Sequence, residues 1–166
     1  MNGGTGRREP VRPIAVRCRQ RGVAMVEFAI SVPVLLLLLF VTVEVGRFLN
    51  QYSILTDSVR DASRYVAGAA VQGTTGLIVQ GPAWSALVVQ GQNLAVYGNL
   101  TGTGTPLLPG LSVADVTVTA DTVGNNVTVS AAYPYQGIFG GSMPDFMGGS
   151  VSTAWTLQIA TTMRAL

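Results

Sequence analysis

The sequence contains no histidine and no lysine, and its single cysteine, Cys18, lies close to the N-terminus. Without histidine the chain cannot form a Ser–His–Asp triad or a Cys–His nucleophile, and it lacks a side chain that most zinc sites use. Its glycine-rich pieces also lack the Gly-Lys-Ser/Thr ending that a phosphate-binding loop requires. We therefore expect a protein that is not an enzyme and that binds neither a metal nor another cofactor.

Charged residues are also scarce, at 11% of the chain, and they are unevenly placed. Residues 1–22 carry six arginines against one glutamate, a balance of +5, whereas the rest carries four arginines against seven acidic residues, a balance of −3. Because arginine is enriched on the cytoplasmic side of membrane segments, this asymmetry predicts a cytoplasmic N-terminus and an exported C-terminal part. A nucleic-acid-binding arm is the alternative interpretation. The position of the arginines directly before an apolar run favours a topology signal, so we expect no nucleic-acid partner.

The apolar run has the length of a membrane span. Between Val23 and Val43 the only charged residue is Glu27. A helix of this length spans roughly 30 Å, the thickness of a bilayer's hydrocarbon core, so we expect a transmembrane helix over residues 23–43. A carboxyl group is unfavourable in lipid, which makes Glu27 a candidate functional residue; the alternative is a boundary residue that reaches water. An ordinary signal peptide has a shorter apolar core and a small-residue cleavage site after it, which this run lacks.

Three short segments of the sequence carry a resemblance to known proteins. The first is a basic segment ending in Gly22 and followed by an apolar helix with Glu27 at its fifth position, which is the pattern of a type IV prepilin leader. The others are EVGR at 44–47 and SVRDASRY at 58–65. These two segments resemble the helix continuation of TadE-like proteins, which are the minor pilins, or pseudopilins, of tight-adherence (type IVc) pilus systems. The resemblance is specific over residues 19–67 and loose beyond them.

The resemblance implies processing and a set of partners. A prepilin peptidase would cut between Gly22 and Val23, leaving Val23 as the N-terminus and Glu27 as the residue that pairs with a neighbouring subunit during assembly. The implied partners are the membrane, this peptidase, other minor pilins, the major pilin, and the inner-membrane platform and ATPase of the pilus machine. The implied place is the cytoplasmic (inner) membrane, as a single-pass protein, or the pilus tip, with a role in assembly, surface adhesion and biofilm formation. The alternative is an uncleaved, membrane-anchored binding module outside the cytoplasm.

The expected fold class is α+β and pilin-like, with a long N-terminal transmembrane and stalk helix packed on a small antiparallel β-sheet domain that includes a second short helix. The expected parts are a basic leader at 1–22, cleaved after Gly22, a transmembrane part at 23–43, a stalk at 44–67 and an exported α+β domain at 68–166.

The stalk is predicted from apolar residues at spacings of three and four, which form one stripe of a helix. The stripe consists of Val45, Phe48, Tyr52, Leu55, Val59, Ala62 and Val66. Its members from Phe48 to Val59 are candidate helix-packing residues, which pack either in a filament or on the chain's own C-terminal domain. Oppositely charged residues three apart should also form weak ion pairs. These pairs are Glu44 with Arg47 and Asp61 with Arg64.

The sequence of the C-terminal part predicts a second helix and three strands. Residues 83–97 have helical apolar spacing, although Gly91 weakens this prediction. Alternating apolar and polar residues predict strands at 116–121 and 127–131, joined by a turn at Gly124-Asn125-Asn126. A third strand is expected from residue 151 to 164, and its apolar face consists of Val151, Thr153, Trp155, Leu157, Ile159 and Met163. Such a sheet needs a cover on its apolar face, and the stalk helix is the nearest one.

The loop from Gln136 to Gly149 combines apolar side chains with five glycines. If exposed, it would be an unusual apolar patch that suits a partner or a surface. Its candidate contact residues are Phe139, Met143, Phe146 and Met147. The alternative is a long loop whose aromatic side chains fold back under the sheet.

Overall fold

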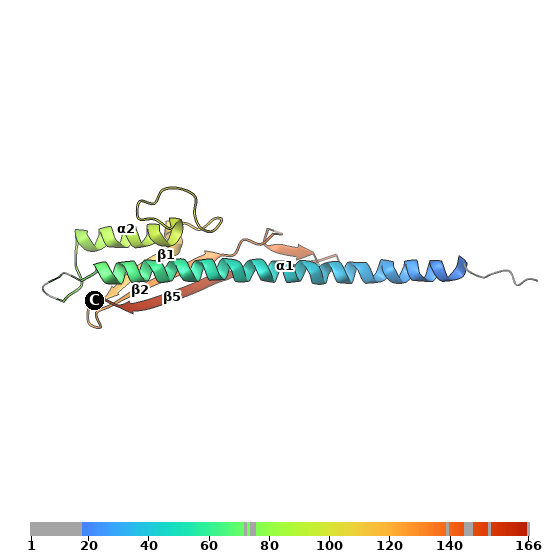
Figure 1. Cartoon of the computed structure of the whole chain (residues 1–166), viewed down its shortest axis with the longest axis horizontal. Helices are drawn as coiled ribbons and strands as arrows, with labels where there is room; N and C mark the ends of the chain where they lie inside the picture. The colour runs from blue at the N-terminus through green and yellow to red at the C-terminus, as the bar shows by residue number, and fades with distance from the viewer. Residues whose placement is uncertain are drawn as a thin grey trace, which may run out of the picture. The chain divides into compact units, whose positions relative to one another are not determined.

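The structure, a computed structural model, describes residues 18–71, 73, 76–138, 140–144, 148–152 and 154–165. The chain divides into two compact units, Met1–Val41 and Thr42–Leu166. Helix α1 (Cys18–Ala69) belongs to both, and the remaining helices and strands belong to the second unit (Figure 1). This arrangement is the expected α+β, pilin-like layout of a long apolar N-terminal helix, a short second helix and a small antiparallel sheet.

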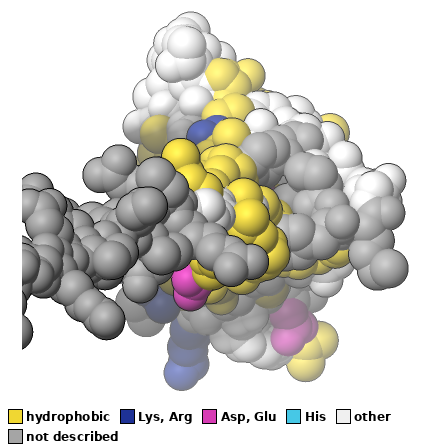
Figure 2. Space-filling view, turned by 90° about the vertical axis from the view of Figure 1, so that its right-hand side faces the viewer, with side chains coloured by type: hydrophobic (Ala, Val, Ile, Leu, Met, Phe, Trp, Pro, Cys, Tyr) yellow, Lys and Arg dark blue, Asp and Glu magenta, His cyan; other side chains and the backbone are white. Residues whose placement is uncertain are grey.

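In the first unit, α1 exposes nearly all of its apolar side chains. Val23, Phe28 and Leu38 are 68%, 66% and 64% exposed. The view of the molecule in Figure 2 shows a patch of hydrophobic side chains with a few charged side chains beside it. Pro33 lies inside the helix, which membrane helices tolerate. Within the part of the chain that the structure describes, α1 is the one helix long and apolar enough to cross a membrane.

The second unit contains a three-stranded antiparallel sheet in the order β1-β2-β5. Strands β1 (Val116–Asp121) and β2 (Asn126–Pro134) form the predicted hairpin, and β5 (Thr156–Arg164) pairs with the other edge of β2. Apolar side chains alternate with exposed polar ones, so one face of the sheet is buried and the other faces solvent. The buried side chains are Val116, Val118, Val127, Val129, Ala131, Tyr133 and Leu157.

The C-terminal half of α1 contributes the largest helical share of this core. Four members of its apolar stripe are fully buried in the same cluster as the sheet residues. They are Leu55, Val59, Ala62 and Val66. Because these side chains recur every three or four residues, they lie on one face of the helix, and this face packs on the domain that follows it in the chain.

Helix α2 (Pro82–Tyr97) completes the core and matches the predicted second helix closely. Pro82 occupies its first turn, where a missing N–H costs nothing, and Gly98 ends it in a left-handed conformation with φ of 71°. Gly91 is buried, and a Cβ atom there would lie 2.5 Å from Cγ2 of Val66 and 3.6 Å from Cγ2 of Val118. The glycine that weakens the sequence prediction is therefore required where α1, α2 and β1 meet.

The prediction of one final strand over 151–164 is wrong. Residues Ser150–Ser152 form β4, which pairs with β3 (Ser142–Pro144) in a separate two-stranded ladder, and β5 begins only at Thr156. The β2–β5 ladder ends at the pair Pro134–Thr156, and one further backbone hydrogen bond follows it, from the Tyr135 N–H to the Trp155 carbonyl. Val151 and Trp155, which were predicted to face the core, are 59% and 51% exposed.

Candidate functional site

The predicted processing and assembly residues lie together on one face of α1. Gly22, Val23 and Glu27 line a shallow, open depression with Val26 and Ile30, all of them exposed. Their spacing of one, three and four residues explains this grouping, since such positions share one side of a helix. Among the lining residues Glu27 is the only ionisable one, so the depression presents one carboxyl group on an apolar surface.

The bond between Gly22 and Val23 lies inside the helix, because α1 begins at Cys18. Glycine is about 1 kcal/mol less favourable than alanine in a helix interior, so this turn opens more easily than the apolar turns after it. A Cβ atom on Gly22 would meet nothing within 4 Å. A larger side chain at Gly22 therefore fits the fold of the chain itself.

The four candidate helix-packing residues have different surroundings. Leu55 and Val59 are fully buried in the core of the second unit, and Phe48 is half-buried against it. Tyr52 belongs to the same stripe but is 44% exposed. The stripe beyond Tyr52 thus packs on the chain's own domain, while Tyr52 stays available to another molecule.

Glu44 is a buried acidic residue that the sequence did not single out as functional. Its side chain is only 5% exposed, and its carboxyl oxygens accept hydrogen bonds from the Tyr135 hydroxyl at 3.0 Å and from the Ile138 backbone N–H at 3.3 Å. Gly137 permits this arrangement, because a Cβ atom there would collide with the Glu44 carboxyl. Burial, followed by the hydrogen bond to Glu44, raises the pKa of Tyr135 to about 12.

Two more side chains of α1 bind the same segment. The Gln136 carbonyl accepts hydrogen bonds from Arg47 Nε at 3.3 Å and from Gln51 Nε2 at 3.2 Å. Gln51 is itself 4% exposed, and its amide oxygen has no hydrogen-bond partner. Residues 44–51 of α1 are therefore bound by polar contacts to the segment 135–138, about ninety positions later in the sequence.

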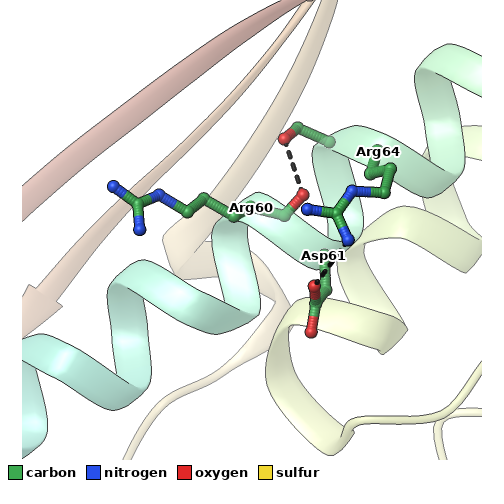
Figure 3. A network of polar contacts seen from close by, with 4 residues as sticks. Arg60, Asp61 and Arg64 are labelled. Carbon is green, nitrogen blue, oxygen red and sulfur yellow. Dashed lines mark hydrogen bonds and ion pairs between the residues drawn. The ribbon is translucent and has the colours of Figure 1, made fainter.

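These contacts bear on the two predicted ion pairs. Asp61 and Arg64 do pair, at 4.0 Å on the exposed side of α1 (Figure 3). Glu44 and Arg47 instead bind Tyr135, Ile138 and Gln136, so the expected pairing of Glu44 with Arg47 is replaced by contacts to the segment after β2.

The candidate contact loop lies mostly outside the described residues, which include neither Phe139 nor Phe146 nor Met147. Met143 lies in β3, where it pairs with Val151 of β4. Within the described residues no group of three His, Cys, Asp or Glu side chains is placed to hold a metal ion.

Comparison with known proteins identifies the N-terminal part of the chain. The model of the family described as "TadE-like protein" matches residues 22–64, which include Glu27, Glu44 and most of the stalk. Searches of curated proteins and of solved structures gave no match. Over residues 22–64 the chain is therefore similar to the TadE-like family that its sequence resembles.

Proposed function

We propose that this chain is a minor pilin, or pseudopilin, of a tight-adherence pilus, inserted in the cytoplasmic membrane and cleaved after Gly22 by a prepilin peptidase. Its exported part then lies outside the cytoplasm, and the protein acts in pilus assembly, surface adhesion and biofilm formation. It has no catalytic activity in this role. Its partners are the other minor pilins, the major pilin and the platform of the pilus machine.

One observation supports this proposal above the others. Gly22, Val23 and Glu27 share one exposed face of an apolar helix that matches the TadE-like family. In a bilayer this face would meet lipid, where an isolated carboxyl group is strongly unfavourable. A residue so placed needs a partner of opposite charge within the membrane.

Cleavage supplies that partner. A chain cut after Gly22 begins with a free amine at Val23, on the same helix face as the Glu27 carboxyl group. Two processed helices side by side can then pair the amine of one with the carboxyl group of the other. Because neither group is stable alone in lipid, the pair favours assembly and fixes the register between subunits.

Processing is tested with Gly22→Leu in the full chain, expressed with its pilus system. The leucine side chain has room in α1, so the variant should insert in the membrane and keep its leader, whereas the wild type should begin at Val23. N-terminal sequencing of membrane extracts measures this directly. Gly46→Leu is the matched control, since Gly46 also has no atom within 4 Å of its Cβ position and should not affect cleavage. A Gly22→Leu chain that still begins at Val23, or a wild type that keeps its leader, would refute the proposed cleavage.

The same experiment separates assembly from processing with Glu27→Leu. This change makes the helix more apolar, so the variant should be inserted and cleaved normally but should support few pili. Asp57→Leu is the control, because Asp57 is an exposed acid of the same helix beyond the apolar run. Normal piliation by Glu27→Leu would reduce Glu27 to a residue at the headgroup boundary.

A further inference from the structure

The second unit carries an aromatic cluster next to the end of the apolar run. Phe48 contacts Tyr135 edge to face, with ring centroids 5.4 Å apart, and Trp155 at 5.7 Å. Tyr135 and Trp155 stack at 6.5 Å, and the Tyr135 N–H donates to the Trp155 carbonyl at 2.8 Å. These contacts fix Trp155 against α1 while leaving 51% of it exposed.

Exposed apolar side chains surround this cluster. Val45 and Leu49, which flank Phe48 on α1, are 48% and 58% exposed. Ile138, whose N–H binds the Glu44 carboxyl group, is 51% exposed. With Phe48 and Trp155 they form one surface, which we call the aromatic platform, and the buried Tyr135 supports it.

The position of the platform along α1 indicates what covers it. Phe48 is five residues beyond Val43, where the uncharged run ends, which is about 7–8 Å along the helix axis. The headgroup region on each side of a bilayer is about 5–8 Å thick. A helix that crosses the membrane up to Val43 therefore holds Phe48, and with it Trp155, at the depth of the lipid headgroups.

The side-chain chemistry fits the same place. Tryptophan is enriched at membrane–water interfaces, because it has an apolar body and a polar N–H group. Glu44 is buried, so Arg47 is the first exposed charged residue after the run, and a cation is the charge that lipid phosphates attract.

We propose that the aromatic platform lies in the outer headgroup layer of the membrane and seats the exported domain on the lipid surface before assembly. The partner is the lipid itself, and the proposal rests on the membrane insertion proposed above. A minor pilin that leaves the membrane must then withdraw Trp155 from the lipid, so that the platform is exchanged for contacts within the pilus.

The two tryptophans of the chain provide a test with a built-in control. Trp84 belongs to α2, which packs near Val66, and Val66 lies about 27 Å beyond Phe48 along α1. Full-length Trp84→Phe and Trp155→Phe variants each keep one fluorescent tryptophan. They are reconstituted in vesicles of phosphatidylcholine and phosphatidylglycerol whose acyl chains are brominated either near the glycerol end or near the methyl end.

The Trp155 emission should shift to the blue and be quenched more strongly by bromine near the glycerol end, whereas Trp84 should be quenched by neither lipid. If the chain floats with the vesicles but Trp155 is quenched only by a water-soluble quencher, the platform proposal is overturned and the pilin proposal stands. Shielding of Trp155 that disappears when the protein is diluted in lipid would assign the platform to a second copy, which also overturns it. A chain that does not float with the vesicles contradicts both proposals.

Discussion

Glu44 directly follows the uncharged run, yet its side chain turns into the core of the second unit rather than toward water. A buried carboxyl group is tolerated only where donors replace the water that it loses. Tyr135 and Ile138 supply these donors, and Gly137 leaves the space for them. The group thus fixes where the helix enters the domain, on the membrane side of the core that begins at Leu55.

Replacement of Glu44 by glutamine should destabilise the domain by about 1–3 kcal/mol, because the amide oxygen can satisfy only one of the two donors and the amide N–H groups face the other. The full chain in detergent should then melt roughly 2–4 °C lower for each kcal/mol, as followed by near-ultraviolet circular dichroism of its aromatic side chains.

Asp61→Asn is the control for this change. It neutralises an acid of the same helix that is 67% exposed and only 4.0 Å from its partner, so its effect should stay within about 0.5 kcal/mol. Equal melting temperatures of Glu44→Gln and the wild type would show that the buried contacts of Glu44 add no stability.

Among the elements, the hairpin and α2 follow from local patterns, whereas the entry of α1 into the domain does not. The alternation in β1 and β2 and the helical spacing in α2 depend on residues close in sequence, so they could be predicted. The burial of Glu44 depends on residues about ninety positions away, and a lone acid on a stalk is more often solvated. The split between β4 and β5 depends on where β2 ends, at Pro134, and not on the alternation in residues 151–164.

The same distinction applies to the candidate sites. Gly22, Val23 and Glu27 could be found because spacing along one helix determines which residues share a face. The aromatic platform could not, since Phe48, Tyr135 and Trp155 come from three distant segments. The one local signal for it was Trp155 itself, a large amphipathic side chain placed on a face that the sequence assigned to the core.

The packing of α2 on α1 gives a prediction at the scale of elements. Gly91→Ala should gain about 1 kcal/mol of helix propensity but lose about 1–3 kcal/mol by overpacking, because its Cβ would press on the stiff Val66 side chain. We expect a net loss, measured as a lower melting temperature.

Gly68→Ala should have the opposite effect on stability. Gly68 is exposed in the last turn of α1 with nothing within 4 Å of its Cβ position, so alanine should add up to about 1 kcal/mol. Stabilisation by both substitutions would show that α2 does not approach α1 as closely as Val66 and Gly91 indicate.

For the whole molecule, the family match ends at residue 64 and leaves most of the second unit outside it. Removal of a 22-residue leader from the 166 residues leaves 144, most of them beyond the apolar run. The family resemblance implies that the filament-forming subunits of tight-adherence systems consist of little more than one helix. Helices in contact lie about 8–10 Å apart, and a three-stranded sheet with a second helix does not fit between neighbours at that distance.

We therefore predict that sheared pili contain this protein in far smaller amounts than the major pilin. It would lie at the tip of the pilus, where no subunit packs above it, or remain in the membrane as an assembly primer. Deletion of its gene should stop or sharply reduce piliation, and the wild-type gene, but not Glu27→Leu, should restore it. Quantitative mass spectrometry of purified pili measures the ratio of the two subunits. Near-equal amounts would mean that the lattice accepts the exported domain at every position, and the minor-pilin assignment would then be wrong.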